Sequence, residues 1–262
     1  MILARALEHM KKQHWTGVFI ELVIVVLGVF IGMQVSNWNA AREDALLGRD
    51  YVRRLRTDLN KDLAAMQAQT AYYQEVMQAI KLTDKLLPDA DADPKTLVIN
   101  AYRATEIMYI SATQATWQQI VSSGHLGLLP KGAVEGGLAG YYSFNVGEDI
   151  YKNLNASVYR RVVRDIIPIT VQEAIRAGCS DRLSSIGYPI GFRKTCKLDV
   201  EPALLRSTAQ ALQHDPDVAK TLGYQYSNIY SAVLNDRATI NQIKLALATL
   251  GVADKTDKAA GK

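Results

Sequence analysis

The stretch TGVFIELVIVVLGVFIGMQVSNW, residues 16 to 38, constrains the chain most, because it is apolar almost throughout. As far as Met33 its only charged side chain is Glu21. Taken to residue 36, the stretch has about 20 residues, and a helix rising ~1.5 Å per residue then covers the ~30 Å hydrocarbon layer of a bilayer. We therefore predict a single transmembrane helix over residues 16–36.

Two tryptophans flank this predicted span. Trp15 and Trp38 stand where amphipathic indole rings prefer to lie, at the two water interfaces of a bilayer. A secretory signal would have a shorter apolar region and a small-residue cleavage site, which the sequence after Met33 does not offer. We expect an uncleaved signal anchor with residues 1–15 as a short cytoplasmic lead. No second apolar run near 18 residues occurs in the sequence.

The orientation of the span rests on the two cysteines, because basic residues lie on both sides of it and the positive-inside rule weakens for long translocated domains. Cys179 and Cys196 bound a stretch that contains Gly and Pro, which a disulfide would close. Closure would stabilise the fold by roughly 3 kcal/mol in the chain-entropy model. The alternative is two reduced thiols in a cytoplasmic domain. We favour a disulfide-closed loop over residues 177–200 and an external domain.

Within the predicted span, Glu21 shares one helical face with Gly28 and Gly32, because separations of seven and four return to the same side. Small residues four apart let two spans approach closely, and the carboxylate would then hydrogen-bond a partner span. The alternative is that Glu21 lies a turn inside the interface and reaches toward the headgroups, with the glycines incidental. Both interpretations stay open.

Beyond the span, apolar residues recur at helical spacing. Residues 38–88 contain no proline before the last position and carry apolar side chains at steps near seven, which predicts one long helix continuing directly from the span. A turn rich in Pro and Asp follows. A second helix is expected over residues 94–123, ending at Gly124, since glycine readily adopts the left-handed conformation that terminates helices.

A glycine-rich stretch follows this second helix. Gly132, Gly136 and Gly140 would make the next helix smooth on one side and allow close packing. No predicted strand precedes the stretch and no Lys-Ser or Lys-Thr pair follows it, which argues against a phosphate cradle.

The remaining elements complete an all-α fold. A helix is expected over residues 141–168, and a final helix from Pro216 whose apolar stripe is interrupted where Asp236 occupies an inward position. The polar tail, residues 253–262, is expected to be loose. We predict a transmembrane helix that continues into a long helix, followed by an antiparallel helical bundle, the external region spanning residues 37–252.

Two motifs stand out in roughly the first half of the chain: a Glu-led span ending Gln-x-x-Asn-Trp-Asn, and a Ser-Ser-Gly-x-Leu turn before a helix ending Tyr-Tyr. The residues that carry them are Gln34, Asn37, Trp38, Asn39, Trp117, Ser122, Ser123, Gly124, Leu126, Tyr141 and Tyr142. Together they resemble a family of uncharacterised bacterial single-span membrane proteins. The resemblance implies a bacterial inner-membrane protein with a cytoplasmic N-terminus and a periplasmic C-terminal domain, and it implies no activity. Members often carry Leu-Arg before the Tyr pair, where this chain has VEGGLAGYY.

No residue pattern specifies a chemical reaction. The four histidines have no metal-ligand spacing, the cysteines lack the Cys-x-x-Cys pattern, and no Gly-x-Ser-x-Gly elbow occurs. The formal net charge of +4 is spread along helical segments, which gives no support to a nucleic-acid partner. We therefore expect no catalytic residues, no metal and no cofactor.

Two classes of function remain. The first is a non-enzymatic, membrane-anchored interaction or scaffold protein that associates with itself or serves as an accessory subunit of a membrane complex. Its partners would be the lipid bilayer and a second copy or another membrane protein. The alternative is an extracytoplasmic small-ligand sensor that signals through a partner span. Its candidate ligand contacts are Arg160, Arg161, Arg164, Tyr141, Tyr142 and Tyr159.

Overall fold

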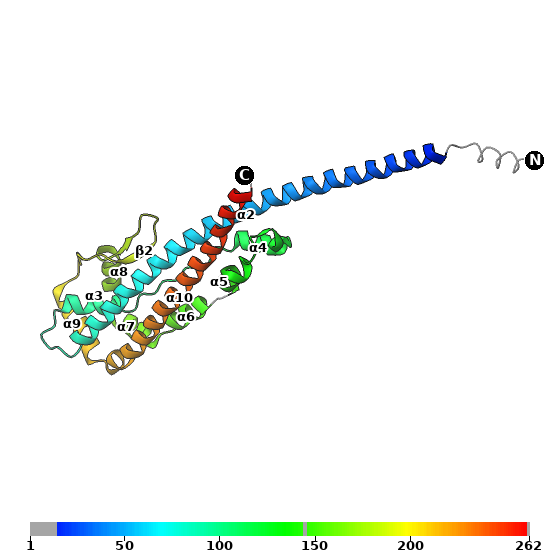
Figure 1. Cartoon of the computed structure of the whole chain (residues 1–262). Helices are drawn as coiled ribbons and strands as arrows, with labels where there is room; N and C mark the ends of the chain where they lie inside the picture. Colours follow the sequence, from blue (N-terminus) through cyan, green and yellow to red (C-terminus); the bar gives the residue numbers. More distant parts are fainter. Residues whose placement is uncertain (1–14, 144–145, 261–262) are drawn as a thin grey trace, which may run out of the picture. The chain divides into compact units, whose positions relative to one another are not determined.

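The computed structural model describes residues 15–143 and 146–260 of the 262-residue chain. Residues 1–14, which make up nearly all of the predicted cytoplasmic lead, lie outside the described residues. The chain divides into two compact units, residues 1–51 and 52–262. The described backbone is mostly helical, as predicted (Figure 1).

The first unit consists, in its described part, of the beginning of α2 (Trp15–Leu86). Its large apolar side chains between Phe19 and Trp38 are exposed, with Phe19 and Trp38 each at 65%. A continuous apolar surface of this kind is unfavourable in water and suited to lipid. Among the described residues, this helix alone is long and apolar enough to cross a membrane. It continues without a break past residue 51, as the proline-free segment predicted.

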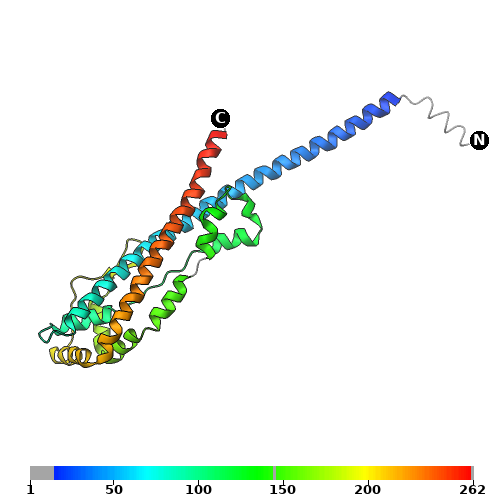
Figure 2. The same cartoon turned by 60° about the horizontal axis from the view of Figure 1, so that its bottom comes forward.

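The second unit packs shorter helices against the rest of α2. In chain order they are α3 (Pro94–Arg103), α4 (Ala115–Ser122), the 3₁₀ helix η1 (His125–Leu128), the π-helix η2 (Val134–Leu138), α5 (Ala139–Ser143), α6 (Val146–Asn155), α7 (Val158–Ile166), α8 (Ile169–Gly178), α9 (Pro202–His214) and α10 (Pro216–Ala260). A small antiparallel hairpin of β1 (Asp181–Leu183) and β2 (Pro189–Phe192) follows α8, with Asp181 opposite Phe192. Figures 1 and 2 both place α10 beside the second half of α2.

The core of the second unit lies among α2, α3, α6, α7, α8, α9 and α10. Its fully buried side chains include Val76, Leu97, Val98, Leu154, Tyr159, Val163, Val171, Leu212, Val218 and Ile229. Full burial of one such aliphatic side chain contributes about 1.5–3 kcal/mol. The apolar stripe predicted for the last helix is confirmed as core, because Leu222, Val233, Ile243 and Leu250 are buried in it as well.

The helix predicted over residues 94–123 is wrong, since α3 ends at Arg103 and the chain leaves helical geometry until α4. The intervening residues 104–114 find tertiary hydrogen-bond partners instead. The Thr113 amide and hydroxyl both donate to the buried carboxylate of Asp62, at 2.9 and 2.6 Å. Such bonds replace those that a continuous helix would have made within itself.

The helix predicted over residues 141–168 is also interrupted, because α6 ends at Asn155 and α7 begins at Val158. Ser157 caps α7, and its hydroxyl donates to Gln225 of α10 at 2.7 Å. Serine competes well for a helix N-cap, which explains why the chain breaks here.

Two predicted helix boundaries are confirmed. Gly124 follows α4 in the left-handed conformation, with φ of 71°, and α10 begins at Pro216. In the polar tail predicted over residues 253–262, α10 continues as far as Ala260. No proline occurs in that segment, and its Ala and Lys residues have high helix propensity.

The glycine-rich stretch packs against α10, although by a different set of glycines from the one predicted. A Cβ at Gly136 would lie 2.8 Å from an α10 side chain, whereas one at Gly140 would meet nothing within 4 Å. Gly132 forms a turn with φ of 79°. Gly137 has φ of 153°, and a Cβ there would lie 2.8 Å from the backbone nitrogen of Ala246. Only glycine suits this position, because both its φ and its closeness to α10 exclude a side chain.

Candidate functional site

A disulfide joins Cys179 and Cys196, the pair that the sequence predicted, with their Cα atoms 4.7 Å apart. It ties the end of α8 to the chain that follows β2, so the β1–β2 hairpin is closed into a loop. Gly178 makes this approach possible, because a Cβ there would overlap the carbonyl oxygen of Lys197.

The hairpin is held against α2 by Glu75. One carboxylate oxygen of Glu75 accepts a hydrogen bond from the Phe192 amide at 2.6 Å, and the other pairs with Arg182 at 2.6 Å. Gly191, with φ of 140°, leaves the space for this carboxylate, since a Cβ there would overlap the Glu75 carboxyl carbon. The hairpin therefore has a fixed position on the second unit.

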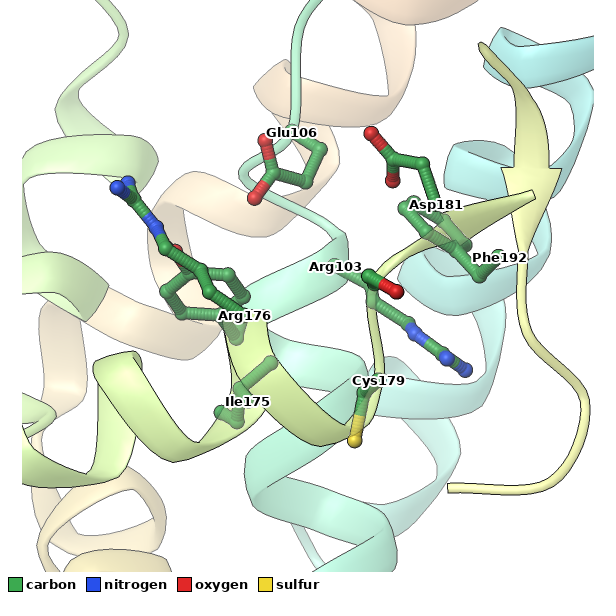
Figure 3. Close-up of a pocket in the computed structure, with 9 residues that line it drawn as sticks. Arg103, Glu106, Ile175, Arg176, Cys179, Asp181 and Phe192 are labelled. Carbon is green, nitrogen blue, oxygen red and sulfur yellow. The ribbon is translucent and has the colours of Figure 1, made fainter. Parts of the chain in front are cut away.

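A cleft of about 310 Å³ lies between the end of α3, the end of α8 and the hairpin (Figure 3). Its volume is at the lower end of the ~300–1,000 Å³ range of small-molecule sites. The lining residues combine both charges with aromatic and apolar groups: Tyr102, Arg103, Glu106, Ile175, Arg176, Cys179, Ser180, Asp181 and Phe192. We take this cleft as the candidate site.

Two carboxylates, Glu106 and Asp181, border the same part of the cleft in Figure 3. Burial and the negative charge of Glu106 raise the pKa of the Asp181 carboxyl above its usual value. The Tyr72 hydroxyl donates to Asp181 at 3.5 Å, which is a long hydrogen bond. Two like charges around one small space favour the entry of a positive group.

Arg103 supplies a positive charge to the lining of the cleft. Its guanidinium lies 4.7 Å from the centre of the Phe192 ring and donates to the Arg193 carbonyl oxygen at 2.8 Å. Burial lowers the pKa of Arg103 from its usual value. Its Nε is buried and has no hydrogen-bond partner. Most buried polar atoms in proteins have a hydrogen-bond partner, so the unpaired Nε of Arg103 is unusual.

A network around Tyr102 holds the third side of the cleft in place. Arg164 lies over the Tyr102 ring at 3.7 Å and donates to its hydroxyl at 2.6 Å. The same guanidinium pairs with Glu106 at 2.9 Å and donates to Thr105 at 2.7 Å. Arg176 also donates to the Tyr102 hydroxyl, at 2.7 Å. Charge-assisted hydrogen bonds of this kind fix the positions of Glu106 and Arg176 before any ligand arrives.

The arginines predicted as ligand contacts have different surroundings in the structure. Arg164 belongs to the network, and Arg160 donates to the Thr105 carbonyl oxygen beside it. Arg161 is exposed. Tyr159 is fully buried, and its hydroxyl donates to the Ala101 carbonyl oxygen at 3.3 Å, as a core residue would.

The predicted tyrosine pair belongs to a different polar cluster. The Tyr141 hydroxyl donates to Asp62 at 2.8 Å, and burial raises the pKa of Tyr141 above its usual value. The Tyr142 ring stacks on Trp117 with centres 5.0 Å apart and planes 7° apart. The pair thus serves the contact between α2, α4 and α5, and the structure does not join it to Arg164 as one site.

A buried carboxylate between α2 and α10 is the other unusual group. Asp236, 2% exposed, accepts a hydrogen bond from Gln69 at 2.8 Å, and burial raises its pKa to about 7. The second oxygen of Asp236 and the amide oxygen of Gln69 are both buried without a partner. A proton on Asp236 would turn that second oxygen into a hydrogen-bond donor. Burial favours this neutral form of the carboxyl group.

The predicted span residues are exposed in the single chain. Glu21 is exposed, and a Cβ at Gly28 or Gly32 would meet nothing within 4 Å. Within the described part of one chain, no residue therefore packs against this small polar face. Among the described residues, no three His, Cys, Asp or Glu side chains are placed to hold a metal ion.

Sequence reasoning did not find the residues that line the cleft. Arg103, Glu106 and Asp181 have no shared motif, and of the lining residues the sequence pointed only to Cys179. No family model, no curated protein and no solved structure matches the chain. The resemblance to the single-span bacterial family therefore stays a prediction.

Proposed function

We propose that this protein is a non-enzymatic, membrane-anchored interaction protein that pairs with a second copy of itself through the outer face of α10. In this proposal residues 16–36 cross the bacterial inner membrane, the N-terminus is cytoplasmic and the second unit is periplasmic. The exposed apolar surface of α2 supports the anchor. The disulfide between Cys179 and Cys196 supports the periplasm, because disulfides persist in oxidising compartments.

The observation that carries the pairing is a stripe of uncharged residues on α10, which we name the outer stripe. Its members recur at alternating steps of three and four and are all exposed: Tyr224, Ser227, Ser231, Leu234, Ala238, Asn241, Leu245 and Ala248. This alternation is the spacing at which two helices pack side by side as a coiled coil.

The composition of the outer stripe differs from that of an ordinary solvated helix face. Such a face is normally charged, yet the stripe carries no charge along its whole length and includes Tyr224 at 70%, Leu245 at 55% and Leu234 at 47% exposure. The opposite side of α10 is buried in the core, through Ile229, Ile243 and other residues. The outer stripe therefore lacks the charges that a solvated helix face normally presents opposite a buried one.

A second copy fits the outer stripe better than an unrelated partner. In a parallel pair each residue meets its own counterpart, so Asn241 would meet Asn241, and an amide carries both a donor and an acceptor for its twin. Arg237 and Lys244 flank the stripe on one side. A parallel pair sets Arg237 beside the neutral Gln242 of the other copy, whereas an antiparallel pair would bring the cations of the two copies together.

The face of Glu21, Gly28 and Gly32 would supply a second contact between the same two chains inside the membrane. Small residues on one face allow close approach of two spans, and Glu21 would find a hydrogen-bond partner there. This contact agrees with the lack of any neighbour at Gly28 and Gly32 in the single chain.

Cysteine cross-linking in native membranes tests the pairing and its direction. Ser231→Cys and Ala248→Cys stand near opposite ends of the outer stripe, and in a parallel pair both should cross-link to their own counterparts under mild oxidation. An antiparallel pair would not cross-link at both positions. Absence of cross-linking at both positions would overturn the proposal.

A charge substitution measures how much the outer stripe contributes. Leu234→Glu should shift the intact protein in mild detergent from dimer to monomer, as measured by light scattering after gel filtration, because two carboxylates would be buried in the seam. Ile169→Glu is the matched control, since Ile169 is 74% exposed and lies outside the stripe on α8. An unchanged dimer fraction in Leu234→Glu would refute pairing through α10.

A further inference from the structure

We infer that the cleft between α3, α8 and the hairpin binds a small zwitterion that carries an ammonium and a carboxylate group, of the size of an α-amino acid. This site is separate from the outer stripe and does not depend on the proposed pairing. It would make the second unit a receptor for a free metabolite as well as an interaction module.

The charges of the cleft favour a ligand with both signs. Glu106 and Asp181 supply two carboxylates, and Arg103 and Arg176 supply two guanidinium groups, so the lining is electrically balanced. A purely anionic ligand would face the two carboxylates, and a purely cationic one would face the two guanidinium groups. A zwitterion can set its ammonium group against the carboxylates, of which Asp181 has no ion-pair partner among the contacts described, and its carboxylate against Arg103, which is the electrostatic matching expected of a specific site.

The ammonium end of the ligand would lie between Glu106 and Asp181. The side chains of both residues border the same opening in Figure 3. Their mutual repulsion contributes to the raised pKa of Asp181, and a cation between them would remove that repulsion. The long 3.5 Å bond from Tyr72 leaves Asp181 able to accept a stronger donor.

The carboxylate end of the ligand would be matched by Arg103. Arg103 has a buried Nε without a hydrogen-bond partner, and a carboxylate is the acceptor that best satisfies a guanidinium. Arg176 lines the other side of the cleft, where its Nε donates to the Tyr102 hydroxyl and its side chain points away from Arg103 (Figure 3). The rings of Tyr102 and Phe192 and the side chain of Ile175 provide apolar wall for the rest of a small ligand.

The site is organised before a ligand binds. Arg164 fixes Glu106, the disulfide at Cys179 fixes the end of α8, and Glu75 fixes the hairpin. A preformed site loses less conformational entropy on binding, which favours affinity for a ligand as small as an amino acid.

Titration of the intact protein in mild detergent with each of the twenty common L-amino acids tests this inference. We expect at least one to raise the midpoint of thermal unfolding in a saturable way, since a ligand that binds only the folded state stabilises it. For that amino acid, the amine lacking the carboxylate and the acid lacking the ammonium should each bind at least tenfold more weakly. If none of the twenty raises the midpoint, or if the amine alone binds equally well, the inference is wrong.

Two substitutions locate the site. Asp181→Asn and Arg103→Lys should each weaken binding of that amino acid at least tenfold, measured by calorimetry, while leaving the midpoint without ligand close to that of the unchanged protein. Glu173→Gln is the matched control, because Glu173 is exposed on α8 and does not line the cleft. Equal affinity in all three variants would place binding elsewhere. Leu234→Glu should still bind the amino acid, which separates this test from that of the pairing.

Discussion

Replacing Asp236 with asparagine should stabilise the second unit at neutral pH and above. Asp236 is buried between α2 and α10, and its hydrogen bond comes from a neutral amide, that of Gln69. Asparagine keeps the oxygen that accepts this bond and places a donor where the second carboxylate oxygen now lies unpartnered. The substitution therefore removes a buried charge and keeps the shape of the side chain.

The expected magnitude follows from the pKa of Asp236. Burial raises this pKa from the ordinary value of 3.8 to about 7. The folded state then holds a proton that the unfolded chain has lost between about pH 4 and pH 7, so the unchanged protein loses stability as the pH rises through this window. At ~1.4 kcal/mol per pH unit, the loss amounts to about 4 kcal/mol. An asparagine side chain does not titrate, so the Asp236→Asn variant should gain up to about 4 kcal/mol over the unchanged protein between pH 4 and pH 8.

Urea unfolding of both proteins in mild detergent, followed by circular dichroism from pH 4 to pH 8, measures this gain. The difference in unfolding free energy between variant and unchanged protein should be small near pH 4 and should grow until about pH 7. Taking the difference cancels the titration of other groups, such as Asp181, whose pKa is also raised. A difference that does not change with pH would refute the assignment of a protonated Asp236 to the folded state.

Three further predictions concern other parts of the chain. Cys179→Ser should lower the unfolding free energy by roughly 3 kcal/mol in urea titrations, as expected for opening a loop of this length, and reductant should have no further effect on the variant. Gly137→Ala should lower the melting temperature and cost about 1–3 kcal/mol, because φ of 153° and the nearby α10 backbone oppose a side chain. Gly140→Ala, where nothing lies within 4 Å, should be neutral or slightly stabilising. Gly32→Ile should weaken association of the span by roughly 1–2 kcal/mol in a bacterial two-hybrid assay, while Val23→Leu on another face should not; equal effects would leave the glycine face without a role.

Features with a local cause could be predicted from the sequence. The continuity of α2 follows from the absence of proline before residue 88, and the left-handed Gly124 follows from the freedom of glycine. The disulfide follows from two cysteines at the ends of a turn-rich stretch. In each case neighbouring residues decide the structure, so a sequence pattern is sufficient.

Features that depend on distant partners could not be predicted. Residues 104–114 leave the helix because Asp62, which lies 51 positions before Thr113, offers stronger hydrogen bonds than the next helical turn. The cleft likewise depends on Arg103 meeting the chain that follows the hairpin, 90 positions later, as its bond to the Arg193 carbonyl shows. Helix periodicity carries no information about such long-range contacts. Asp236 lies between these two cases. The apolar pattern of the last helix predicted its inward position, but it did not predict its partner Gln69.

The packing of α2 against α10 sets a minimum time for folding during synthesis. Gln69 and its partner Asp236 are 167 positions apart, and ribosomes add about 5–20 residues each second. The buried side of α2 around Gln69 must therefore wait about 10–30 s before its partner on α10 has been made. During this time a nascent chain would expose this apolar surface. A chain cut before Pro216 would never bury it, so such truncations should aggregate instead of forming a smaller bundle.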